Sequence, residues 1–112
     1  MPPTPNKRVA ILTCMDARID PLDLLGLELG DAHVLRNAGA IVTEDVLRSL
    51  AGSRDIGTVD VIVIGHTDCG LGPGEEKRVL EAVAELKSSA AGGGRVTGYV
   101  FDPFSRELRK IV

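Results

Sequence analysis

Runs of apolar, β-favouring residues recur along the chain, and each is followed by polar or turn-forming residues. This pattern predicts strands. The predicted strands cover residues 8–13, 31–36, 59–66 and 96–102, followed by a short antiparallel edge strand over 107–112. The first run is apolar throughout, which is typical of a strand covered on both faces of a sheet. The third is the most hydrophobic, so we expect it at the centre.

The segments between these strands carry the sequence signals of helices, which are capping residues and apolar residues at helical spacing. Asp20 is a typical N-cap, Pro21 suits the first helical position and Gly26 a stop, so a short helix is predicted there. Thr43 and the acids after it predict a second helix start. Its predicted apolar face is Val46, Leu47, Leu50 and Ala51. A third helix is predicted from Glu75 to about Ala90, ended by the triple glycine at 92–94. Its predicted stripe is Val79, Leu80, Val83 and Leu86.

The order of these elements predicts an α/β fold. We expect a mostly parallel central sheet of four strands plus a C-terminal antiparallel edge strand, flanked by helices. The chain has 112 residues and no internal repeat, so residues 1–112 are expected to form a single domain.

Composition excludes several classes of partner. The formal net charge is -3 and aromatic residues make up 3% of the chain, which argues against a nucleic-acid partner. No apolar run approaches the roughly 20 residues that cross a bilayer. The proline-rich residues 1–6 do not resemble a signal peptide. We therefore expect a cytoplasmic protein without a membrane partner.

Candidate chemistry lies directly after the first and third predicted strands. If these strands are parallel neighbours, Cys14, His66 and Cys69 meet at the same edge of the sheet. Two thiolates and an imidazole suit Zn²⁺, and a catalytic zinc takes three protein ligands and leaves a fourth position free. The alternatives are a Cys14–Cys69 disulfide, which a cytoplasmic compartment disfavours, and two merely buried thiols.

Three motifs in this order resemble those of the β-class carbonic anhydrases. They are Cys14-x-Asp16-x-Arg18, Arg36-Asn37-Ala38-Gly39-Ala40 and His66-x-x-Cys69. The resemblance extends from about Lys7 to the C-terminus. It implies one Zn²⁺ per chain, held by Cys14, His66 and Cys69. It also implies a lyase, carbonate dehydratase, in which zinc-bound hydroxide reversibly hydrates CO₂ to bicarbonate and a proton.

The resemblance also implies roles for the neighbouring residues. Asp16 and Arg18 form the catalytic dyad: held by Arg18, Asp16 accepts a hydrogen bond from the hydroxide. When the pair breaks, Asp16 becomes the fourth zinc ligand of a closed state. The alternative is a solvated Asp–Arg surface pair that contributes little. The expected supporting residues are Gly39 and Ala40, with a backbone amide near the substrate, Asn37, which fixes the loop, and Asp68, beside the ligands. His33 is expected to be structural.

The chain departs from the family in two places. Family members carry more chain before the first strand and a longer helical excursion after the His-x-x-Cys loop, elements that ordinarily complete the cleft at a dimer interface. We expect a homodimer or higher homo-oligomer. Three functions remain open at this point: a carbonic anhydrase, a zinc hydrolase of another small heterocumulene such as carbon disulfide or carbonyl sulfide, and a non-catalytic zinc-binding homologue or scaffold.

Overall fold

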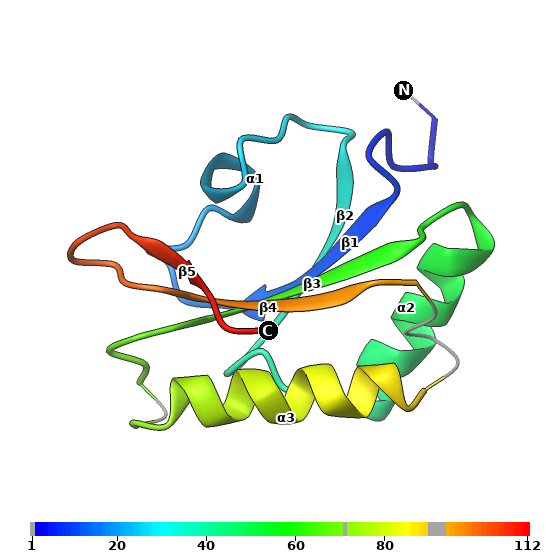
Figure 1. Cartoon of the computed structure of the whole chain (residues 1–112). Coiled ribbons are helices and arrows are strands. Elements are labelled where there is room, and N and C mark those ends of the chain that lie inside the picture. Colours follow the sequence, from blue (N-terminus) through cyan, green and yellow to red (C-terminus); the bar gives the residue numbers. More distant parts are fainter. Residues whose placement is uncertain (1, 71, 90–93) are drawn as a thin grey trace.

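Five strands form one mixed sheet in the computed structural model, which describes residues 2–70, 72–89 and 94–112 (Figure 1). The strands are β1 (Val9–Cys14), β2 (Ala32–Asn37), β3 (Asp60–His66), β4 (Val96–Phe101) and β5 (Leu108–Lys110). Their order in the sheet is β2-β1-β3-β4-β5. The first four are parallel and β5 runs antiparallel to β4. The predicted fold class is confirmed, and β3 is central as expected.

The register of the central strands determines where the chemistry lies. Thr13 of β1 pairs with Ile64 of β3, so Cys14 and His66 reach the carboxyl edge of the sheet side by side. All six residues of β1 are buried. Thr13 contributes to this junction, because its hydroxyl donates to the carbonyl of Ile64 (2.9 Å).

The helices cover the sheet unequally. Helix α1 (Pro21–Leu24) is capped by Asp20, α2 (Glu44–Asp55) by Thr43, and α3 (Glu75–Lys87) follows Gly74, whose φ is 98°. Figure 1 shows α2 and α3 on one side of the sheet and α1 on the other. No helix within the described residues is long and apolar enough to cross a membrane.

Helix α3 ends at Lys87, before the end predicted near Ala90. Residues Leu71, Ala90, Gly92 and Gly93, which carry parts of the predicted loop and helix stop, lie outside the described residues.

Two positions assigned to buried helix faces were wrong. Leu80 is 43% exposed, whereas Ala82 is 5% exposed. The buried stripe of α3 is Val79, Ala82, Val83 and Leu86. Its spacing of i, i+3, i+4 and i+7 places Leu80 about 100° away from Val79 around the helix.

On α2, Ala51 is exposed and Ser53 takes the buried place. The Ser53 hydroxyl lies 2.7 Å from Thr58 Oγ1 and also bonds His33 Nδ1, so this buried polar group has partners. The His33 ring is hydrogen-bonded to Ser53 within the fold, which is consistent with the expected structural role of this residue.

A pair of glycine substitutions tests the packing of α3 on the sheet. A Cβ at Gly98 would lie 2.6 Å from Val79 Cγ1 and 3.0 Å from Val83 Cγ2. We therefore expect Gly98→Ala to lower the free energy of unfolding by about 1–3 kcal/mol. Gly52, on α2, has open space around it. Gly52→Ala is expected to raise the free energy of unfolding by up to about 1 kcal/mol, because alanine favours the helix more than glycine does. Urea unfolding measures both, and equal effects would contradict the described packing.

Candidate metal centre

Three soft or borderline donor groups converge at the carboxyl edge of the sheet. Cys14 is the last residue of β1, His66 the last of β3, and Cys69 follows three residues later. One ligand atom from each residue lies within 4.8 Å of the others, and Cys14 and His66 are buried. Both cysteines are free, so the disulfide alternative is wrong. Cys69 is half-buried rather than enclosed, which leaves this side of the group accessible.

The hydrogen bonding of His66 prepares one nitrogen as a ligand. Nδ1 lies 2.8 Å from the carbonyl of Thr67 and donates to it. In the neutral form of a ring that donates from Nδ1, Nε2 is the nitrogen that carries a free lone pair. It is fully buried and has no hydrogen-bond partner among the described residues. An unpaired buried acceptor is costly. A cation between Nε2 and the two sulfurs would satisfy it, so the donor set fits a zinc ion.

The loop after β2 supports the Cys14 sulfur. The backbone amide of Gly39 donates a hydrogen bond to Cys14 Sγ at 3.4 Å. Asn37 closes this loop, because its side chain donates to the carbonyl of Ile41 (2.7 Å) and accepts from the Ile41 amide (2.9 Å). Ala40 is buried in the core on the α2 and α3 side, so its side chain lies away from the donor atoms.

Asp16 lies beside the donor group and is held by Arg18. Arg18 Nε donates to Oδ1 (3.0 Å) and Nη2 to Oδ2 (2.7 Å), and the Arg18 amide also donates to Oδ1 (2.8 Å). Hydrogen bonding from the Arg18 side chain is the main reason that the pKa of Asp16 lies well below its usual range. Asp16 Oδ2 is 3.8 Å from His66 Nε2. Asp16 is therefore a carboxylate that lies at the edge of the donor group while it is paired with Arg18.

Arg18 makes further contacts that sequence reasoning missed. Its Nη1 donates to Asp68 Oδ2 (3.0 Å) and its Nη2 to the Asp68 carbonyl (3.0 Å). The two carboxylates raise the pKa of Arg18, chiefly through the Asp16 hydrogen bonds. Phe104, in the turn between β4 and β5, lies with its ring centroid 5.9 Å from the guanidinium carbon. No sequence signal links Phe104 to the site, whereas Asp68 lies within the His-x-x-Cys motif.

An open cavity of about 340 Å³ lies over the donor group. Its walls bring together Cys14, Asp16, Gly39, His66 and Cys69 with Met15, Ala38 and Gly70. Of the predicted supporting residues, Asn37, Ala40 and Asp68 are not among its walls. Ala38 has a small side chain and Gly39 and Gly70 have none, which leaves room for a small ligand next to the donor atoms.

Arg36 secures the segment that carries Cys14 and Asp16. Its Nε donates to the carbonyl of Cys14 (3.0 Å) and its Nη2 to the carbonyl of Asp16 (2.7 Å). The carbonyls after β1 are thereby satisfied at the point where the chain leaves the sheet. The side chains of Cys14 and Asp16 are consequently presented from a fixed backbone.

Comparison with known proteins identifies, over most of the chain, the family that the three sequence motifs resemble. A sequence model of the carbonic anhydrase family matches residues 9–90. The β-carbonic anhydrase 1 of Mycobacterium tuberculosis is 54% identical over 72 residues, which are 63% of this chain and 44% of that protein. A carbon disulfide hydrolase of Saccharolobus solfataricus is 51% identical over 67 residues, 59% of this chain and 33% of that protein. The alignments thus span less than half the length of these relatives.

A solved structure extends the likeness to the whole fold. The crystal structure of a carbonic anhydrase from Streptococcus mutans superposes with a TM-score of 0.94 at 35% sequence identity. The superposition covers 100% of this chain and 86% of that one. The arrangement of strands and helices described above is therefore shared with a protein of known structure.

Proposed function

We propose, from the premise that this chain belongs to the β-class carbonic anhydrase family, that it is a zinc enzyme that interconverts carbon dioxide and bicarbonate. One observation carries the proposal. Cys14, His66 and Cys69 place their ligand atoms within 4.8 Å of one another, and His66 Nε2 is buried and unpaired among the described residues.

The donor set is suited to a single zinc ion per chain. Two thiolates and one imidazole would hold the ion and leave its fourth position open toward the cavity. A zinc ion bound there supplies a hydroxide nucleophile near neutral pH by lowering the pKa of a water molecule. The Gly39 amide donates to Cys14 Sγ, so we propose that this amide supports the ligand rather than contacting the substrate.

Asp16 is the residue we assign to orienting the nucleophile. As a carboxylate it only accepts hydrogen bonds, and its Oδ2 lies at the edge of the donor group. An O–H group donating to Asp16 would have its lone pair turned toward the cavity. Arg18 keeps the carboxylate in this place, because the bidentate pair opposes its movement into the ligand set. The closed state in which Asp16 joins the metal ligands stays a prediction.

A second substrate class is favoured by one comparison. The Saccharolobus solfataricus relative is named a carbon disulfide hydrolase, at 51% identity. Carbon disulfide and carbon dioxide are both linear molecules with an electrophilic central carbon. The cavity over the donor group is open in the single chain, so the walls that this chain supplies set no size limit that separates the two molecules. Hydrolysis of carbon disulfide is therefore the second candidate for the same site.

The test combines metal analysis with substrate assays on the zinc-reconstituted chain. We expect one zinc per chain and stopped-flow hydration of carbon dioxide that increases between about pH 7 and about pH 9. Carbon disulfide and carbonyl sulfide are assayed in parallel, and faster turnover of either would favour the second candidate. Stoichiometric zinc without turnover of any of the three would identify a non-catalytic zinc-binding protein. Failure to bind zinc would overturn both enzymatic proposals.

A substitution at Asp68 tests the Asp16–Arg18 pair with a smaller expected effect. Its carboxylate and carbonyl both accept from Arg18, and its φ of 51° is in the left-handed region. Asp68→Asn keeps the shape and tolerates that backbone conformation but weakens the ion pair. We expect an approximately tenfold decrease in kcat/KM with zinc content unchanged, since the ion pair between Arg18 and residue 68 becomes a hydrogen bond from Arg18 to a neutral acceptor. A variant as active as the parent chain would show that Asp16 alone positions Arg18.

We further propose that residues 1–112 act as a single domain and that the chain forms a homodimer or higher homo-oligomer. The support is family membership together with the openness of the cavity, which no other described element of the chain closes. Light scattering coupled to size exclusion measures the assembly. A monomer at micromolar concentrations with full activity would contradict the expectation that a partner completes the cleft.

A further inference from the structure

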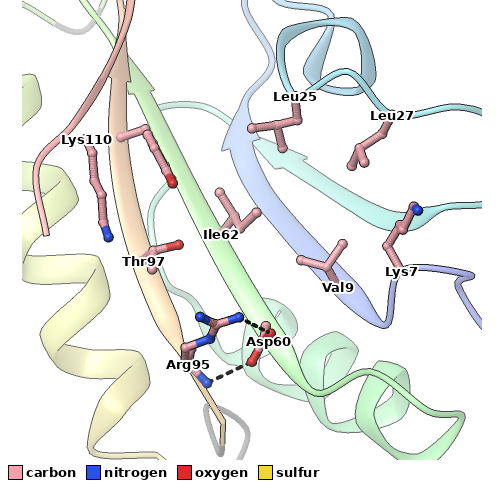
Figure 2. Close-up of a pocket in the computed structure, with 10 residues that line it drawn as sticks. Lys7, Val9, Leu25, Leu27, Asp60, Ile62, Arg95, Thr97 and Lys110 are labelled. Atoms are coloured by element: carbon pink, nitrogen blue, oxygen red, sulfur yellow. Dashed lines mark hydrogen bonds and ion pairs between the residues drawn. The ribbon is translucent and has the colours of Figure 1, made fainter.

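A second groove lies on the sheet face opposite α2 and α3, away from the metal centre. Its volume is about 380 Å³. Side chains alternate along the strands, so Ile62 of β3 and Thr97 of β4 face the groove while Val61 and Gly98 face the helices. Figure 2 shows Val9, Ile62 and Thr97 along its floor. The groove is therefore built into the regular sheet rather than into a loop.

The groove exists because α1 covers only part of this face. The leucines of α1 and the residues after it pack on Ile11, Ile64 and Phe101, toward the carboxyl ends of the strands. The amino-terminal half stays open, and Ile62 is only half-buried there. A mostly parallel sheet is normally covered on both faces. An apolar floor is thus left for an occupant.

The rim of the groove is basic. Lys7, Arg95 and Lys110 lie around it, as Figure 2 shows, and Asp60 is the carboxylate among its lining residues. Asp60 is already engaged, because it accepts from the Arg95 amide (3.0 Å) and lies 3.5 Å from Arg95 Nη2. Within the described part of the chain, neither Lys7 nor Lys110 has a carboxylate partner in ion-pair range. Two cations are thus available above an apolar floor.

Size and charge select among possible occupants. A volume of about 380 Å³ falls within the range of small-molecule sites. A second copy docked face to face would bury Lys7 and Lys110 against a lining whose one carboxylate, Asp60, is already paired with Arg95, so these cations would have no free anionic partner. A nucleic acid would need stacking surfaces, and Tyr99 is the one aromatic residue of the lining. A neutral apolar ligand would leave both lysines unused.

We propose that this groove binds an amphiphilic organic monoanion, with its aliphatic or aromatic body on Val9 and Ile62 and its carboxylate at Lys7 or Lys110. The site is separate from the metal centre and does not depend on the proposed enzymatic function. Binding there requires neither zinc nor turnover.

Octanoate is the probe, and backbone amide NMR of the complete chain locates it. Octan-1-ol and octylammonium serve as neutral and cationic counterparts of the same chain length. We expect saturable octanoate binding near about 1 mM, with shifts concentrated on β1, β3 and β4 around Val9, Ile62 and Thr97. Octan-1-ol should bind at least about tenfold more weakly, and octylammonium more weakly still. Equal binding of all three would overturn the proposal.

A charge-reversal pair supplies the matched control. Lys7→Glu/Lys110→Glu is expected to weaken octanoate binding by about tenfold or more. Lys77→Glu/Lys87→Glu makes the same change in net charge on α3, at positions outside the groove, and should leave affinity within about twofold. Equal weakening in both variants would show a non-specific effect of net charge and overturn the site. Unchanged melting temperatures verify that both variants are folded.

Two other outcomes would also overturn it. Carboxylates bind zinc, so shifts centred on Cys14, His66 and Cys69 that disappear in His66→Ala would place octanoate at the metal centre. Groove shifts that depend on protein concentration and are unaffected by octanoate would show that a second copy occupies this face. Persistence of the groove shifts in His66→Ala supports the proposal independently of any result on catalysis.

Discussion

His66→Ala is expected to abolish stoichiometric zinc binding, and with it the hydration of carbon dioxide. The variant removes one of three donor groups and the only nitrogen among them. Losing a residue that merely orients a ligand lowers metal affinity 10- to 100-fold as a rule, so losing a ligand should cost more than about 100-fold. Zinc per chain after reconstitution and dialysis measures the effect. Thermal unfolding gives a second readout, since zinc should raise the melting temperature of the parent chain alone.

Two further variants separate ligation from folding. His66 is 2% exposed, so its truncation also leaves a cavity. Cys69→Ser is nearly isosteric at a half-buried position and should lose zinc without that penalty. His33→Ala removes the other histidine of the chain and its bonds to Ser53 and Pro3. It should lower stability yet retain the metal. Stoichiometric zinc in both His66→Ala and Cys69→Ser would show that these residues are not ligands.

Asp16→Asn is expected to retain zinc and to lose about 100-fold in kcat/KM. The amide keeps the size of the side chain but presents one acceptor where the carboxylate presents two, and its pairing with Arg18 loses the ionic component. The orientation of the nucleophile should therefore fail while Cys14, His66 and Cys69 stay in place. Stopped-flow hydration together with metal analysis on the same samples distinguishes this outcome from metal loss.

Asp45→Asn is the matched control. Asp45 pairs with Arg48 on the surface of α2, with both side chains more than three-quarters exposed. An exposed pair of this kind contributes about 0.5 kcal/mol or less, so activity should be unchanged. Should Asp16→Asn behave like Asp45→Asn, the interpretation of Asp16 and Arg18 as a solvated surface pair would be the better one.

The convergence of Cys14 and His66, with Cys69 on the loop that follows His66, could be predicted because it depends mainly on strand order. Parallel neighbouring strands align their carboxyl ends, and β1 and β3 are neighbours in the sheet. No side-chain detail was needed. The helix starts at Asp20 and Thr43 could also be predicted, because each depends only on one capping side chain and a backbone amide close to it in sequence.

Features that depend on packing between distant elements could not be predicted. Ile62 lies in the most hydrophobic run, yet it is half-buried because α1 is too short to cover it. Leu80 is exposed although it is apolar, because the rotation of α3 on the sheet selects Ala82 instead. The contact of Phe104 with Arg18 depends on where the β4–β5 turn lies above the sheet. Hydrophobicity along a sequence does not encode such placements.

Arg18 bridges two segments whose contact residues, Arg18 and Asp68, lie 50 positions apart in sequence. Its guanidinium connects the turn that carries Asp16 to the turn that carries Cys69, through hydrogen bonds to Asp16 and Asp68. We expect a displacement of the second turn on gain or loss of a metal to reach Asp16 through these contacts. Because such linkage is reciprocal, the proposed binding of an ion at Cys69 and the position of Asp16 are expected to influence each other.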